Sequence, residues 1–171
     1  MKAHYTWNMR DVMTEVKAWL EQGDPVAVAT VISTWGSAPR PAGSRMAISQ
    51  SGKIAGSISG GCLEGEVFEQ AQAILKGKPA SLFHYGVSDD LAWTVGLSCG
   101  GEVDVLIEPL APVHRELMTA LEAERPVVLK TDVGEKPGAR QLLTLADPDV
   151  PLTTLLASTP PPRPQASELA G

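Results

Sequence analysis

The sequence lacks several features that would assign it to a specialised class of protein. Its 171 residues are 43% apolar, yet the longest mostly apolar run, residues 26–32, is far too short to cross a membrane. The first residues contain no apolar segment typical of a signal peptide. Two cysteines, Cys62 and Cys99, are too few for a disulfide scaffold. We therefore expect a cytoplasmic protein with reduced thiols and no membrane contact.

Motifs for nucleotides, nucleic acids and zinc are also missing. Neither GxGxxG nor GxxxxGK[ST] occurs, so no NAD or other nucleotide site is expected in this chain. The net charge of -6 argues against a general nucleic-acid binder. The two cysteines belong to no CxxC pair, and the three histidines show no metal-ligand spacing. A structural zinc site is therefore not expected.

Acidic residues are absent from one long stretch of this acidic chain. Residues 25–63 contain no Asp or Glu but include Arg40, Arg45 and Lys53. Twelve of the 16 glycines fall between Gly36 and Gly101. A basic, glycine-rich and acid-free stretch suits a small anionic ligand. The alternative is a chance distribution of surface charges.

The hydrophobic pattern predicts an α/β fold, with a mixed sheet flanked by helices in a single compact domain. Asn8 is the expected N-cap of the first helix, which Gly23 ends. We expect this domain to cover residues 1–146, followed by a proline-rich, disordered tail at 147–171. The predicted helices span 9–22, 62–76 and 113–124, and the predicted strands span 25–33, 45–49, 53–58, 81–85, 102–108, 126–131 and 139–146.

A weak internal repeat accompanies this pattern. A helix, a strand, a proline-glycine loop and a second strand occur at residues 9–49 and again at 113–146. Thr30 and Thr131 correspond within the first strand, and Arg45 and Arg140 correspond at the start of the second. The second copy is six residues shorter, with the deletion near residues 35–40. If the repeat is real, the extra loop residues have a role that is specific to the first copy.

The first candidate site is the turn that contains Ser59, Gly60, Gly61 and Cys62. We predict that a helix begins at Cys62, so that unpaired backbone N–H groups could bind an anion. The positive end of the helix dipole is then expected to favour the thiolate of Cys62, which iodoacetamide should label before Cys99. The alternative is a buried, inert cysteine below a tight turn.

A second turn, with Cys99, Gly100 and Gly101, precedes the predicted strand at 102–108 and mirrors the first. Two thiols on facing turns would suit sulfur chemistry or a soft metal. Cys99 could equally be a thiol that only packs at the end of a strand.

Arg40 and Arg45 lie in the proline-rich segment 35–45. Guanidinium groups bind phosphate or carboxylate through paired hydrogen bonds, so both arginines are candidate ligands for an anion. The alternative is a surface loop with two solvated charges.

These motifs resemble the N-terminal domain of the XdhC/CoxI family, the accessory factors of xanthine dehydrogenase and related molybdenum hydroxylases. The matching segments are residues 28–46, 52–71 and 85–110, so that the resemblance covers about residues 11–110, with 113–146 as a more variable continuation. Longer members of the family carry a C-terminal Rossmann domain, whose fingerprint this chain lacks. The resemblance therefore implies a separate Rossmann-domain partner or a homo-oligomer.

The resemblance implies that the chain transiently binds the molybdenum cofactor, a phosphate-bearing pterin dithiolene also called molybdopterin. It implies a chaperone that protects the cofactor during sulfuration and delivers it to an apo-hydroxylase, together with a cysteine desulfurase. The cysteines of the family fall on Cys62 and Cys99, the possible contacts to molybdenum, and its Gly-Ser-Xaa-Pro-Arg loop ends at Arg40. Two alternatives stay open, namely a scaffold without cofactor binding and a thiol-based sulfur transferase.

Overall fold

The computed structural model describes residues 9–36, 38, 40–86, 101–134, 137–138 and 140–144. The predicted tail at 147–171 lies outside these residues, as does Asn8. No helix in the described ranges is long and apolar enough to cross a membrane. The elements, in chain order, are α1 (Arg10–Glu21), β1 (Val26–Trp35), β2 (Arg45–Ser49), β3 (Ile54–Gly56), α2 (Glu64–Leu75), β4 (Ser81–Tyr85), β5 (Glu102–Pro109), α3 (Pro112–Glu122), β6 (Val127–Thr131) and β7 (Arg140–Thr144).

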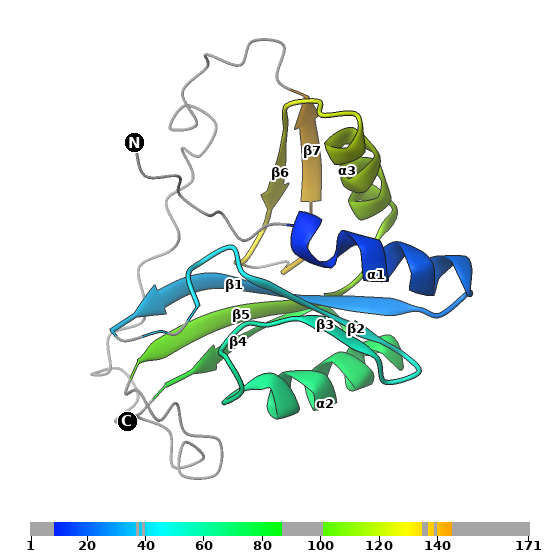
Figure 1. Ribbon diagram of the computed structural model, residues 1–171. Coiled ribbons are helices and arrows are strands. Elements are labelled where there is room, and N and C mark those ends of the chain that lie inside the picture. Colours follow the sequence, from blue (N-terminus) through cyan, green and yellow to red (C-terminus); the bar gives the residue numbers. More distant parts are fainter. Residues whose placement is uncertain are drawn as a thin grey trace.

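The predicted α/β class is confirmed, but the sheet is antiparallel throughout rather than mixed, and it lies between two layers. Five strands pair in the order β3-β2-β1-β5-β4, and β6 and β7 form a separate two-stranded sheet. Helix α2 lies on one face of the five-stranded sheet, and α1, α3 and the β6–β7 pair lie on the other (Figure 1). Because successive side chains of a strand point to opposite faces, β2 contributes to both cores. Met46 and Ile48 pack in the cluster beside α2, whereas Ala47 packs with α1.

The helices form where the apolar period predicts them, but their ends differ. In α1 the spacing of Val12, Val16 and Trp19 places all three in the core. Its N-cap is Met9, without a side-chain capping bond, so the predicted cap at Asn8 is wrong. In α3 the first residue is Pro112, whose missing N–H costs nothing at this position.

The predicted strand at 53–58 is shortened to β3 (Ile54–Gly56) by the conformation of one glycine. Gly56 has a φ of 77°, which takes the chain out of the strand. A Cβ atom there would lie 2.3 Å from the carbonyl oxygen of Arg45 and 2.7 Å from Cγ1 of Val12. Only glycine therefore allows this close approach between β3, β2 and α1.

The structure also contains the repeat that the sequence suggested. Thr30 pairs with Arg45 in the β1–β2 ladder, and the corresponding residues Thr131 and Arg140 pair in the β6–β7 ladder. Both copies consist of a helix followed by an antiparallel strand pair. The first copy adds β5 on the other edge of β1.

Candidate functional site

The strand register brings three of the predicted segments to one end of the five-stranded sheet. Trp35, the last residue of β1, pairs with Glu102, the first residue of β5. Gly56, the last residue of β3, pairs with Met46 near the start of β2. The loop with Arg40, the turn at residues 57–63 and Gly101 therefore lie at the same end (Figure 1). Cys99 and Gly100 lie outside the described residues.

Cys62 lies before α2 rather than within its first turn. The helix begins at Glu64 with Leu63 as N-cap, so the prediction that it begins at Cys62 is wrong. The two glycines before Cys62, Gly60 and Gly61, have φ angles of 77° and 121°, outside the helical region, and the N-cap Leu63 has a φ of -107°. The cysteine side chain is half-buried and packs against the core cluster beneath α2. The argument from the helix dipole therefore loses its geometric basis for this thiol.

A carboxylate accepts hydrogen bonds in the turn where the sequence predicted unpaired backbone N–H groups. Oε1 of Glu64 accepts hydrogen bonds from the backbone N–H groups of Ser59, at 3.0 Å, and Gly60, at 3.1 Å. Oε2 accepts the N–H of Gly61 at 2.8 Å and the hydroxyl of Ser59. The Ser57 hydroxyl donates to Oε1 at 2.7 Å. The turn does bind an anion, but that anion is the chain's own Glu64.

The same contacts set the ionisation of Glu64. Its partial burial would raise the pKa, but hydrogen bonds from Ser59 and Ser57 outweigh this effect and lower the pKa to about 2. The residue is therefore ionised at any physiological pH. Sequence reasoning missed Glu64, although a signal existed, since it is the first acidic residue after the acid-free stretch 25–63.

The two candidate arginines do not form one site. Arg45 begins β2, and its Nη1 donates to Sδ of Met9 at 3.3 Å, on the face that α1 covers. Burial lowers the pKa of its guanidinium. Cys62 packs on the opposite face of the sheet, beneath α2. Arg40, half-buried in the loop after β1, lies at the same end of the sheet as Cys62 and stays a candidate, whereas Arg45 faces the other side of the sheet.

Hydrogen bonds also cross three strands at this end of the sheet. His84 of β4 lies with Nδ1 2.7 Å from Oδ1 of Asp104 in β5, and Ser33 of β1 donates to Oδ2 of the same carboxylate. His84 is exposed on an edge strand.

Within the described ranges, no three His, Cys, Asp or Glu residues are grouped so as to hold a metal ion.

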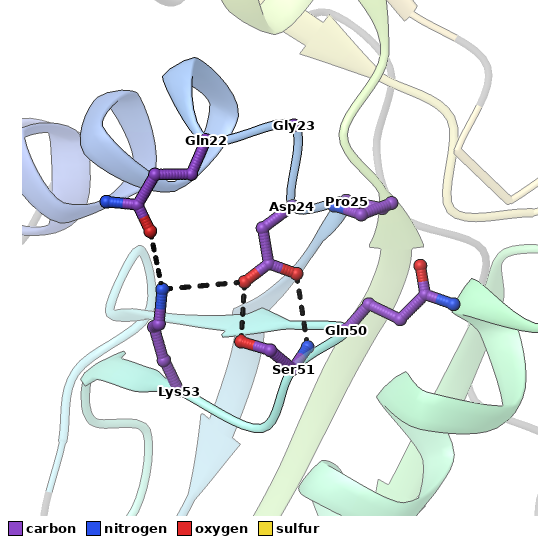
Figure 2. A pocket seen from close by; sticks show the side chains of 7 residues that line it. All are labelled: Gln22, Gly23, Asp24, Pro25, Gln50, Ser51 and Lys53. Atoms are coloured by element: carbon purple, nitrogen blue, oxygen red, sulfur yellow. Dashed lines mark hydrogen bonds and ion pairs between the residues drawn. The ribbon is translucent and has the colours of Figure 1, made fainter.

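A pocket of about 470 Å³ lies at the opposite end of the sheet, between the α1–β1 turn and the β2–β3 turn. Figure 2 shows four polar side chains pointing toward one another, those of Gln22, Lys53, Asp24 and Ser51, whereas Gln50 points away from them. The carboxylate of Asp24 accepts the hydroxyl of Ser51 at 2.6 Å and its N–H at 3.1 Å, and the Ser51 hydroxyl contributes most to lowering the Asp24 pKa. Lys53 lies 3.7 Å from Asp24 and donates to Gln22 at 2.8 Å. These contacts join two turns and involve none of the predicted site residues.

Part of the chain, including the glycine-rich turn with its thiol, is similar to a known family of proteins. Residues 19–86 match the model of the XdhC and CoxI family, so the predicted resemblance is confirmed. Both Arg40 and Cys62 lie inside the matched segment.

Two relatives are named as a xanthine dehydrogenase subunit and as a molybdenum cofactor insertion chaperone. The chain is 33% identical over 109 residues to a probable xanthine dehydrogenase subunit of Bacillus subtilis (strain 168), covering 63% of this chain and 33% of that protein. It is 28% identical over 148 residues to the molybdenum cofactor insertion chaperone PaoD of Escherichia coli (strain K12), covering 84% of this chain and 44% of that protein.

A solved structure has a similar fold. The crystal structure of a xanthine dehydrogenase from Bacillus halodurans matches with a TM-score of 0.62 and 25% identity, over 81% of this chain and 43% of that one. The chain thus covers less than half of the length of each of these proteins.

Proposed function

We propose that this chain is a maturation factor that binds the molybdenum cofactor and assists its sulfuration and insertion into a xanthine dehydrogenase-type hydroxylase. The observation that carries the proposal is the position of Cys62. Its sulfur lies on a glycine-rich turn at the end of the sheet, within the segment that matches the XdhC and CoxI family. The similarity to the insertion chaperone PaoD supports the same role.

In this proposal the cofactor is cargo, and each residue has a limited task. The thiolate of Cys62 faces the molybdenum or its sulfur ligands, because thiolates favour soft metal centres. Arg40 pairs with the phosphate of the pterin. Cys99 supplies a second sulfur, with Gly100 and Gly101 beside it. The N–H groups of Gly60 and Gly61 donate to Glu64, so we assign them to shaping the turn rather than to binding phosphate.

The proposed partners follow from this role. They are an apo-hydroxylase that receives the cofactor and a cysteine desulfurase that supplies sulfur, in the cytoplasm. A Rossmann-domain chain or a second copy of this chain is a further proposed partner. Two other functions remain as alternatives, a scaffold that binds these enzymes without cofactor and a sulfur transferase that carries a persulfide on Cys62 or Cys99.

The proposal predicts that molybdenum and pterin copurify with the chain. The protein is purified from cells that make the cofactor and from otherwise identical cells that cannot, and both preparations are assayed for metal and pterin. We expect both components only in the first preparation, in equal molar amounts. A scaffold or a simple sulfur transferase predicts no difference between the preparations.

A further inference from the structure

The two residues that flank Cys62, Gly61 and Leu63, both have their N–H groups held through the same carboxylate. On one side, the N–H of Gly61 donates to Oε2 of Glu64 at 2.8 Å. On the other side, the N–H of Leu63 donates to the Ser59 hydroxyl at 2.8 Å, and this hydroxyl donates to Oε2. The position of the Cys62 backbone therefore depends on one side chain two residues away.

This arrangement differs from an ordinary helix cap. The N-cap residue Leu63 makes no side-chain capping bond, and Glu64 instead reaches back to donors at residues 57–61. A carboxylate suits these donors because it only accepts hydrogen bonds, through two oxygen atoms. A glutamine would replace one oxygen by an NH₂ group, which would face N–H groups that also donate.

We propose that Glu64 is the positioning residue of Cys62, so that its carboxylate fixes how far the thiol is accessible at the end of the sheet. The importance of this role for cofactor handling rests on the proposed function above. The effect of Glu64 on the reactivity of the thiol is independent of that function, because it follows from the contacts of the turn alone.

The test measures the rate at which iodoacetamide alkylates Cys62, followed by mass spectrometry of the peptide that contains it. In Glu64→Ala we expect this rate to rise by about tenfold or more, because hydrogen bonds to a charged group each contribute strongly to holding the turn in its present conformation. Glu64→Gln, a milder change, should give an intermediate rate. Glu69→Gln, an exposed position on the same helix, is the matched control and should react like the wild type.

Formate provides a chemical rescue. Added to Glu64→Ala, it should refill the turn and slow the alkylation, whereas chloride at the same ionic strength should not. An unchanged rate in Glu64→Ala, or a faster rate that formate and chloride affect equally, would overturn the proposal.

Two further readouts separate positioning from other effects. Loss of a nearby negative charge alone would shift the pH profile of alkylation and leave its limiting rate at high pH unchanged, whereas positioning predicts a higher limiting rate. Global unfolding would make the rate depend steeply on urea, whereas a local opening exposes little surface and predicts a shallow dependence. An unchanged limiting rate or a steep urea dependence contradicts the proposal.

If the wild type carries no molybdenum, the proposed function fails, while these rates still decide the role of Glu64.

Discussion

Replacing Cys62 by alanine is expected to lower the molybdenum content of the purified protein by about tenfold or more, since even indirect partners of metal ligands change metal affinity by about 10–100-fold. The physical reason is the loss of a soft sulfur ligand, which alanine cannot replace and serine replaces only by a harder oxygen. The side chain of Cys62 is only partly buried, so the truncation leaves the core beneath α2 mostly intact. The measurement is the ratio of molybdenum to protein after purification from cofactor-producing cells.

Ser51→Ala is the matched control for this experiment. Ser51 bonds Asp24 at the opposite end of the sheet, so its truncation removes a side-chain hydrogen bond without approaching Cys62. We expect Ser51→Ala to keep the wild-type molybdenum content. If Cys62→Ala also keeps it, the thiol only packs and the scaffold becomes the better hypothesis.

Acidification from pH 6.5 to pH 4 is expected to remove up to about 3 kcal/mol of stability through His114 alone, because burial lowers the pKa of this histidine from its ordinary value to about 4. The Arg45 charge adds to the effect of burial on this pKa. Its Nδ1 accepts the N–H of Ala111 at 2.9 Å, which requires that Nδ1 carries no proton. Nε2 lies 3.6 Å from Oε1 of Glu108 in β5.

The sign follows from the order of the two pKa values. Between pH 4 and 6.5 the unfolded chain binds a proton at His114 that the folded chain does not, so the free energy of unfolding rises with pH across this window. The stabilisation is complete above about pH 6.5, the ordinary pKa of histidine. It is lost as the pH falls toward the folded-state pKa of about 4.

His114→Asn tests this prediction, because the asparagine oxygen can still accept the Ala111 N–H but does not titrate. Urea unfolding at a series of pH values should show the variant losing less stability than the wild type between pH 6.5 and 4. Parallel pH dependences for the two proteins would mean that the histidine is not the group that titrates.

The sequence predicted the elements well where the apolar pattern was strong. The spacing of Val12, Val16 and Trp19 located α1, and the corresponding threonine and arginine positions predicted a repeat whose two ladders share one register. These predictions succeeded because each depends on local periodicity or on residues that pair within one hairpin.

The failures concern contacts that the linear pattern does not show. The turn before α2 has Gly60 and Gly61 in left-handed conformations, which glycine permits but does not require. The N–H groups of the turn, which we predicted to be unpaired, donate to the Glu64 carboxylate because this side chain folds back toward them. Alternation along β2 could have placed Arg45 on the same face as Ala47, away from Met46 and the core beneath α2.

The most direct test of the central claim is transfer of the cofactor to an enzyme. The chain, purified from cofactor-producing cells, is mixed with an apo-hydroxylase of the xanthine dehydrogenase type and then separated from it, and the molybdenum in each protein and the hydroxylase activity are measured. We expect molybdenum to move from the chain to the enzyme and activity to rise in proportion. Activity that rises without any loss of molybdenum from the chain, or no activity with molybdenum retained, would contradict a role in delivering the cofactor.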